Sequence, residues 1–254
     1  MKITFLGTGT SQGVPVIACD CNVCLSSDEH DKRLRSAVLV EVDERVILID
    51  CGPDFRQQML RANVKRLDAI LLTHEHKDHV AGLDDVRAFN WVQKKHAEVY
   101  AENQVHNSIK REFAYAFHDN PYPGVPKISL NAIDESPFQV EGVGIIPIRG
   151  MHMNLPVLGF RIGDFTYLTD MNYIADEELK KVMGSEVLVI NGLRKERHIS
   201  HFKLSESLAI IKKVSPQKGI ITHISHQMGL HDVVNEELPE NTQLAYDQLV
   251  IIIE

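Results

Sequence analysis

One stretch of the sequence decides how the chain is interpreted: Leu71-Leu72-Thr73-His74-Glu75-His76-Lys77-Asp78-His79. Four strong metal ligands lie within six residues, directly behind the apolar run Ala69 to Leu72. A loop that leaves a buried strand can fold such side chains around a cation. Three imidazoles and a carboxylate suit zinc, manganese or iron(II) better than magnesium or calcium, which prefer oxygen ligands. The stretch therefore predicts a metal-dependent enzyme.

Length and composition favour a globular protein with a substantial core. The chain has 254 residues, 44% of them apolar, and we expect one domain over residues 1–254. Its net charge of −8 argues against a nucleic acid partner, because such binding usually needs a basic surface. We find no signal peptide behind Met1-Lys2 and no apolar run of transmembrane length. We therefore expect a cytoplasmic location and no membrane contact.

Hydrophobic patterning predicts a succession of strands and helices without a linker between them. Strands are expected near residues 2–6, 36–42, 45–50, 68–73, 97–101, 143–149, 157–162, 165–169, 186–191, 218–222 and 249–253. Helices are expected near residues 54–63, 82–95, 104–116, 175–183 and 204–214. Asp119 to Pro126 contains three prolines and predicts a surface loop. Mixed sheets with helices outside them imply a layered α/β sandwich.

Three further candidate ligands lie behind other apolar β runs. His152 follows Ile145 to Ile148, Asp170 follows a strand that begins at Phe165, and His223 follows Gly219-Ile-Ile-Thr. Each has the same position relative to its strand as His74 has. If these strands share one sheet edge, all the candidate ligands converge on one rim.

The ligand run, with the downstream pieces in order, resembles the metallo-β-lactamase superfamily over nearly the whole chain. The pieces that carry the resemblance are Thr73 to His79, Gly82-Leu-Asp-Asp-Val-Arg87, His152, Tyr167-Leu-Thr-Asp170 and Thr222-His223. The resemblance implies a four-layer αββα sandwich with a two-metal site at one edge. It implies that one metal is held by His74, His76 and His152, the other by Asp78, His79 and His223, and that Asp170 bridges them.

Such a site can run hydrolysis, because two cations deprotonate a shared water and neutralise developing charge. Classical β-lactamases of the superfamily lack an aspartate bridge, so Asp170 disfavours antibiotic hydrolysis. The flavin-linked di-iron branch typically has Glu at the position of His76, so reduction of oxygen or nitric oxide is disfavoured too. Asp50 corresponds to the superfamily's first motif, where it braces the ligand loop; a simple turn aspartate is the alternative.

A second metal site is predicted by Cys19-Asp-Cys21-Asn-Val-Cys24, which supplies three thiolates in one short loop. His226, three residues beyond His223, can complete a closed Cys3His set, which is typical of structural zinc. The alternative is three free thiols.

Together with Gly7 to Pro15 and Thr222 to His226, the cysteine cluster resembles the cyclic phosphodiesterase branch of the superfamily. The best-understood member of that branch is the phosphoribosyl 1,2-cyclic phosphate phosphodiesterase. A protein of pyrroloquinoline quinone biosynthesis carries a similar cysteine loop.

A proton donor is expected just before the helix near 204–214, where this branch has a histidine. His201 matches best and His198 is the alternative; a leaving alkoxide needs such a group, and imidazole titrates in the useful range.

Three arginines are candidates for binding a second phosphate or a sugar of the substrate, and the sequence does not choose among Arg56, Arg87 and Arg194. The histidines that match no motif are expected at the surface: His30, His96, His106, His118 and His231.

The sequence thus predicts a hydrolase of a small, cyclic phosphodiester. It would use two catalytic metals, zinc or manganese, one structural zinc, a hydroxide shared by the catalytic pair, and His201 as general acid. The alternatives are a tRNA 3′-processing nuclease, a lactone or thioester hydrolase, and an accessory protein without turnover, like that of quinone biosynthesis. A homodimer is the default association.

Overall fold

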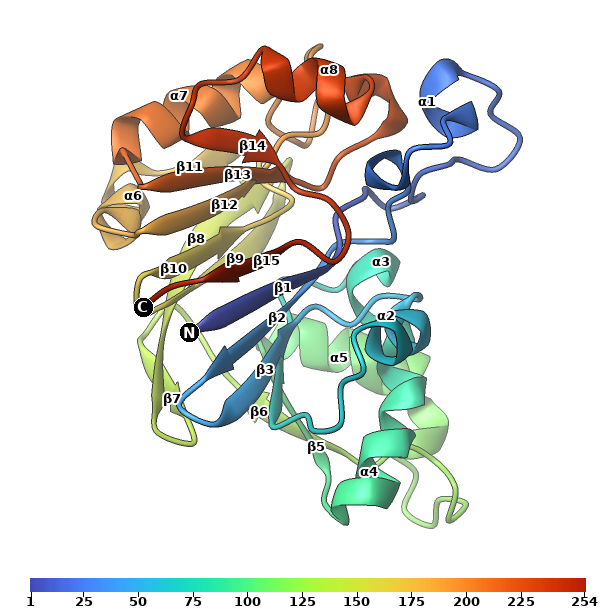
Figure 1. The fold of residues 1–254 in the computed structure, drawn as a ribbon. Coiled ribbons are helices and arrows are strands. Elements are labelled where there is room, and N and C mark those ends of the chain that lie inside the picture. Colours follow the sequence, from blue (N-terminus) through green and yellow to red (C-terminus); the bar gives the residue numbers. More distant parts are fainter.

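The computed structural model describes all 254 residues and arranges them as two β-sheets packed face to face, with helices on both outer sides (Figure 1). In spatial order the first sheet contains β15 (Val250–Ile252), β1 (Lys2–Gly7), β2 (Ala37–Val42), β3 (Arg45–Ile49), β4 (Ala69–Leu71), β5 (Ala97–Ala101) and β6 (Ile128–Ala132). The second contains β11 (Tyr173–Ile174), β8 (Val143–His152), β9 (Leu155–Ile162), β10 (Phe165–Leu168), β12 (Val187–Asn191), β13 (Lys218–Thr222) and β14 (Thr242–Leu244), with β7 (Phe138–Val140) paired to β8.

Helices form the two outer layers. Beside the first sheet lie α2 (Phe55–Arg61), α3 (Lys77–Val80), α4 (Arg87–Gln93) and α5 (Asn103–Glu112). Beside the second lie α6 (Asp176–Val182), α7 (Leu204–Val214) and α8 (His231–Glu236), while α1 (Asn22–Leu25) belongs to a loop that projects between β1 and β2 (Figure 1). No helix combines the length and the apolar character that crossing a membrane requires. The predicted αββα sandwich is confirmed.

Apolar side chains on both faces of the strands form three cores, one between the sheets and one beneath the helices of each sheet. Successive side chains of a strand point to opposite faces of its sheet. In β12, Val187 and Val189 join the core between the sheets, whereas Leu188 and Ile190 pack beneath the helices of the second sheet. All four are buried, which is why the sequence shows a continuous apolar run there rather than alternation.

Parallel pairing sends the carboxyl ends of several strands to one rim. In the first sheet β3 is parallel to β4, and β4 to β5. In the second, β10, β12, β13 and β14 are mutually parallel. Polar residues directly behind these buried strands therefore meet at one edge of the sandwich.

The structure differs from the predicted elements in a few places. The helix expected near 82–95 is a 3-10 helix over Ala81–Val86 followed by α4. Gly82 packs so closely against Gly52 that a Cβ there would lie 2.2 Å from the Gly52 carbonyl oxygen. The backbone adopts the tighter 3-10 turn at this close contact. Strand β8 runs on to residue 152, so His152 ends the strand instead of following it. The short elements β6, β14 and α8 were not anticipated.

Candidate metal centre and its surroundings

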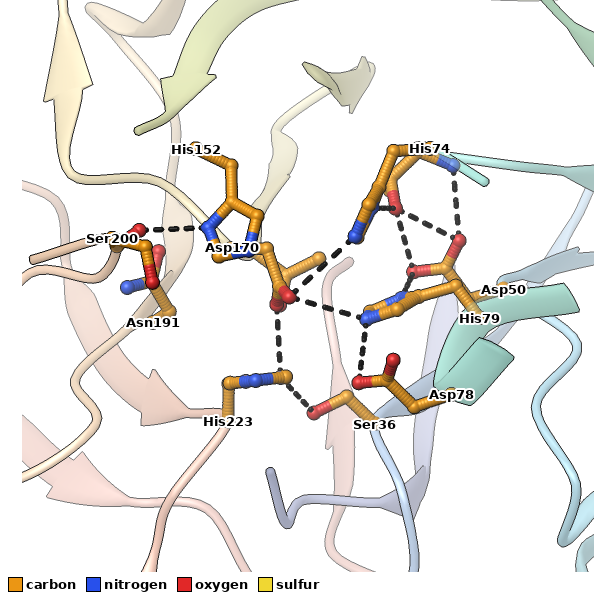
Figure 2. Close-up of polar contacts among 12 residues, drawn as sticks. Ser36, Asp50, His74, Asp78, His79, His152, Asp170, Asn191, Ser200 and His223 are labelled. Carbon is orange, nitrogen blue, oxygen red and sulfur yellow. Dashed lines mark hydrogen bonds and ion pairs between the residues drawn. The ribbon is translucent and has the colours of Figure 1, made fainter. Parts of the chain in front are cut away.

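Two groups of potential ligands lie side by side at this rim and share one carboxylate (Figure 2). In each group the ligand atoms lie within 4.8 Å of one another. The first group is His74, His76, His152 and Asp170; the second is Asp78, His79, Asp170 and His223. The structure therefore brings together all seven residues that the sequence nominated for this site.

Asp170 occupies the middle of the arrangement. Its Oδ2 lies 3.7 Å from His74 Nε2 and 3.3 Å from His79 Nε2, and its Oδ1 lies 2.9 Å from His223 Nδ1. Both Nε2 atoms are buried and make no hydrogen bond. Nitrogen lone pairs aimed at a shared carboxylate without a hydrogen bond are what a cation between them would require.

The outward nitrogens of three histidines are occupied, which turns their other nitrogens towards the centre. Asp50 Oδ2 accepts from His79 Nδ1 at 2.7 Å and Thr73 Oγ1 lies 3.0 Å from His74 Nδ1. Thr73 in turn donates its hydroxyl to Asp50. His152 Nδ1 donates to the Ser200 carbonyl oxygen at 2.7 Å. Partners of this kind set the tautomer and the ring orientation of a metal-binding histidine. Asp50 is a brace and not a simple turn residue.

Backbone geometry aims three of the acidic and imidazole side chains. Asp50, Asp170 and His223 have φ values of 66°, 55° and 55°, in the left-handed region that non-glycine residues seldom adopt. Each comes just behind a buried strand, where the sharp turn directs its side chain inward. Such conformations cost of order 1 kcal/mol and concentrate at functional sites. Gly52 makes the close approach possible, because a Cβ there would lie 2.1 Å from the carbonyl oxygen of Asp78.

The charge balance of the centre calls for cations. Asp50, Asp78 and Asp170 are buried, and none of them pairs with a lysine or arginine. Burial alone would raise the pKa of Asp170 and of Asp78, but the facing imidazoles outweigh it and hold both pKa values below the usual range. Burial also lowers the pKa of His74, which keeps it in the neutral form that binds metals. The residues fit two divalent cations.

Several positioning residues escaped the sequence analysis. Asn191 holds the turn behind Asp170, since its side chain accepts from the Met171 backbone N–H and donates to the Met171 carbonyl oxygen. Ser36 donates to the Gly9 carbonyl oxygen and lies 3.2 Å from His223 Nδ1. Asn191 ends an apolar strand and could have been suspected from that position, whereas no pattern in the sequence singles out Ser36.

The predicted Cys3His cluster also forms. Nδ1 of His226 lies 3.3, 3.4 and 3.6 Å from the Sγ atoms of Cys19, Cys21 and Cys24. Tetrahedral zinc, with bonds of about 2.3 Å to sulfur and about 2.0 Å to nitrogen, separates such ligands by roughly 3.5 Å. The four residues thus fit one closed structural zinc. The fourth cysteine, Cys51, is fully buried and outside the cluster.

His201 lies beside the metal ligands. Its ring centroid is 4.5 Å from that of His152 and 4.9 Å from that of His223, and its buried Nδ1 has no hydrogen-bond partner. Burial lowers the pKa of His201 to about 3. His198 is less buried, and its Nδ1 already contacts Ser200. The geometry favours His201 over His198 as a group that can reach a substrate.

The structure separates the three candidate arginines. Arg194 lies on the segment 192–203, between β12 and α7, which also carries His201. Arg56 lines an apolar slot beside α2, and Arg87 pairs with Asp84 at the start of α4. Of the three, only Arg194 lies on the same connecting segment as His201.

Two of the histidines expected at the surface are buried. The prediction was wrong for His106 and His231, which are 6% and 3% exposed. His231 Nδ1 accepts from the buried Arg33, and its Nε2 lies 2.8 Å from the side-chain nitrogen of Asn235. A network that joins residues far apart in sequence leaves no local pattern to read.

Comparison with known proteins agrees with this geometry. A family model described as a beta-lactamase superfamily domain matches residues 45–224. The chain belongs to this superfamily. It is 37% identical to a solved protein described as a new diphosphatase from the PhnP family, with a TM-score of 0.93 over 100% of this chain and 98% of that one. The zinc-bound PqqB of Methylobacterium extorquens shares the fold, with a TM-score of 0.82, 18% identity and full coverage of both chains.

A curated relative from Porphyromonas gingivalis, named octanoyltransferase, is 44% identical over 257 residues. The match covers 100% of this chain but 52% of the relative, so the chain spans about half its length. These findings show a member of the beta-lactamase superfamily that is similar over its full length to a PhnP-family protein and has a Cys3His cluster. The superfamily fold, together with the two ligand groups, indicates divalent metals.

Replacing Asp50 tests the brace. Asp50→Asn keeps the size of the side chain but removes the charge that His79 and Thr73 face, and we expect metal affinity at the catalytic site to fall about 10- to 100-fold. Competition with a chromophoric chelator measures this. The control is Asp43→Asn, which alters an exposed carboxylate. Equal affinities in both variants would contradict the bracing role.

Proposed function

We propose that the chain is a dimetal phosphodiesterase acting on a small, cyclic phosphodiester. The observation that carries the proposal is the free Nδ1 of His201 beside two ligand groups joined by Asp170. His201 can provide a proton for a leaving oxygen. Two cations in the ligand groups would suit a phosphate, which carries two non-bridging oxygens. The likeness to a PhnP-family diphosphatase over the full chain supports phosphoester chemistry.

The charge near the site also suits an anionic substrate. Residues 194–203 contain four cationic side chains and one acidic one, in a chain whose net charge is −8: Arg194, Lys195, Glu196, Arg197 and Lys203. Lys195 is paired with Glu237, whereas Arg197 and Lys203 form no ion pair. Local positive charge attracts a phosphate. A neutral lactone would gain nothing from this segment.

The chain's own residues can complete the reaction as follows. Divalent cations held by the two ligand groups would supply a nucleophile from water at neutral pH and neutralise charge on phosphate oxygens. Water adds to phosphorus, the bond from phosphorus to the leaving oxygen breaks, and that oxygen takes a proton from His201. The substrate's negative charge favours imidazolium, which opposes the effect of burial on the pKa of His201. Opening a cyclic diester leaves a phosphomonoester and a free hydroxyl.

A substrate screen tests the proposal against its rivals. Zinc- and manganese-loaded protein is incubated with cyclic ribose phosphates, linear phosphodiesters, lactones, thioesters and precursor tRNA. We expect turnover of cyclic phosphodiesters to exceed that of every other class at least tenfold. Turnover of lactones or thioesters without phosphodiesters, processing of tRNA at physiological salt, or no turnover at all would each overturn the proposal.

Replacing His201 tests the proton donor. We expect His201→Ala to lower kcat about 10²- to 10⁴-fold for a diester with an alkoxide leaving group. The loss should be much smaller for a p-nitrophenolate leaving group, which departs without a proton. His198→Ala is the matched control and should leave both rates nearly unchanged. Equal losses for the two leaving groups, with unchanged metal content, would show that His201 does not act as the acid.

A further inference from the structure

A cavity lies away from the metal centre, between α4 and the segment 123–127 of the proline-containing loop. It has a volume of about 600 Å³, which is within the range of small-molecule sites, and it contains none of the candidate metal ligands. Figure 1 shows α4 at the far end of the outer layer from α3, which carries Asp78 and His79. The side chain of Asn90 joins the two walls, since it donates to the carbonyl oxygens of Lys95 and Lys127 and accepts from the Lys127 backbone N–H.

The cavity is cationic in a chain that is acidic overall. Four of its lining side chains are Arg87, Lys94, Lys95 and Lys127, and no carboxylate lines it. Arg87 pairs with Asp84 and Lys95 with Asp68, so these two charges are partly neutralised. Lys94 and Lys127 form no ion pair, which leaves two ammonium groups free for an anion. Unpaired cations that line a concave surface favour phosphate.

The same cavity contains Trp91, the only tryptophan of the chain, and this residue is 76% exposed. The ammonium of Lys94 lies 4.4 Å from the centre of its ring system. An indole so exposed leaves a large planar apolar surface in water, which is favourable when a ligand covers it. Exposed aromatic rings next to cations are the combination on which nucleobases stack while their phosphates are held.

We propose that this cavity binds a nucleotide, with its phosphate on Lys94 and Lys127 and its base against Trp91. The site is separate from the metal centre, and no bond is made or broken there. The proposal does not depend on the substrate of the metal centre.

The position of Trp91 makes the test direct, because intrinsic tryptophan fluorescence reports this cavity alone. Full-length, metal-loaded protein is titrated with adenosine 5′-monophosphate, a monoester that is not a phosphodiesterase substrate. Free tryptophanamide corrects for absorption by the nucleotide. We expect saturable quenching, with binding at least tenfold weaker for adenosine alone and for inorganic phosphate alone.

Charge reversal supplies the matched comparison. The double variant Lys94→Glu and Lys127→Glu should weaken binding at least tenfold, whereas Lys110→Glu with Lys212→Glu makes the same change in net charge on exposed helical positions and should not. Calorimetry on Trp91→Ala should show a loss of about tenfold from stacking. Hydrolysis at the metal centre should be unchanged in all these variants.

Three outcomes would overturn the proposal. Quenching that does not saturate would show that no site exists. Equal affinities in the two charge-reversed variants would show that Lys94 and Lys127 hold nothing. A 5′-phosphorylated oligoribonucleotide that binds more than tenfold tighter than the mononucleotide would identify an RNA end, and not a free nucleotide, as the ligand.

Discussion

The organisation of this protein depends on three carboxylates that are buried together without a lysine or arginine. Ionised groups in such a position are costly unless opposite charge reaches them. Asp50 is stabilised by hydrogen bonds from Thr73 and His79. Asp78 and Asp170 face the imidazole of His79, where cations can bind. The fold serves this arrangement, because parallel strands of both sheets end at the same rim and bring the ligands there.

The cysteine cluster connects to the same rim through a short segment. His223 and His226 are three residues apart, so one turn of chain contributes to both candidate metal sites. The intervening Ile224 exchanges backbone hydrogen bonds with Thr8 and Thr10, at the base of the loop that carries the cysteines. Ser36 links Gly9 in that loop to His223. A cation held by the Cys3His cluster would therefore support the loop from which His223 is positioned.

Much of this could be predicted from the sequence, because the ligands stand directly behind apolar strands. The densely spaced run His74 to His79 and the strand ends at Asp170 and His223 were sufficient to nominate the centre. What could not be predicted depends on tertiary contact: the Ser200 carbonyl oxygen behind His152, Ser36 beside His223, and the burial of His106 and His231. The cationic cavity beside α4 forms only when Lys127, 37 residues further along the chain, packs against Asn90.

The arrangement of the ligands predicts that Asp170 stands between two metal ions. The most direct test is anomalous diffraction from crystals of protein loaded with zinc or manganese. We expect two peaks on either side of the Asp170 carboxylate, roughly 3.5–4 Å apart, and a separate zinc peak among Cys19, Cys21, Cys24 and His226. A single peak at the rim, or a pair that Asp170 does not contact, would contradict it.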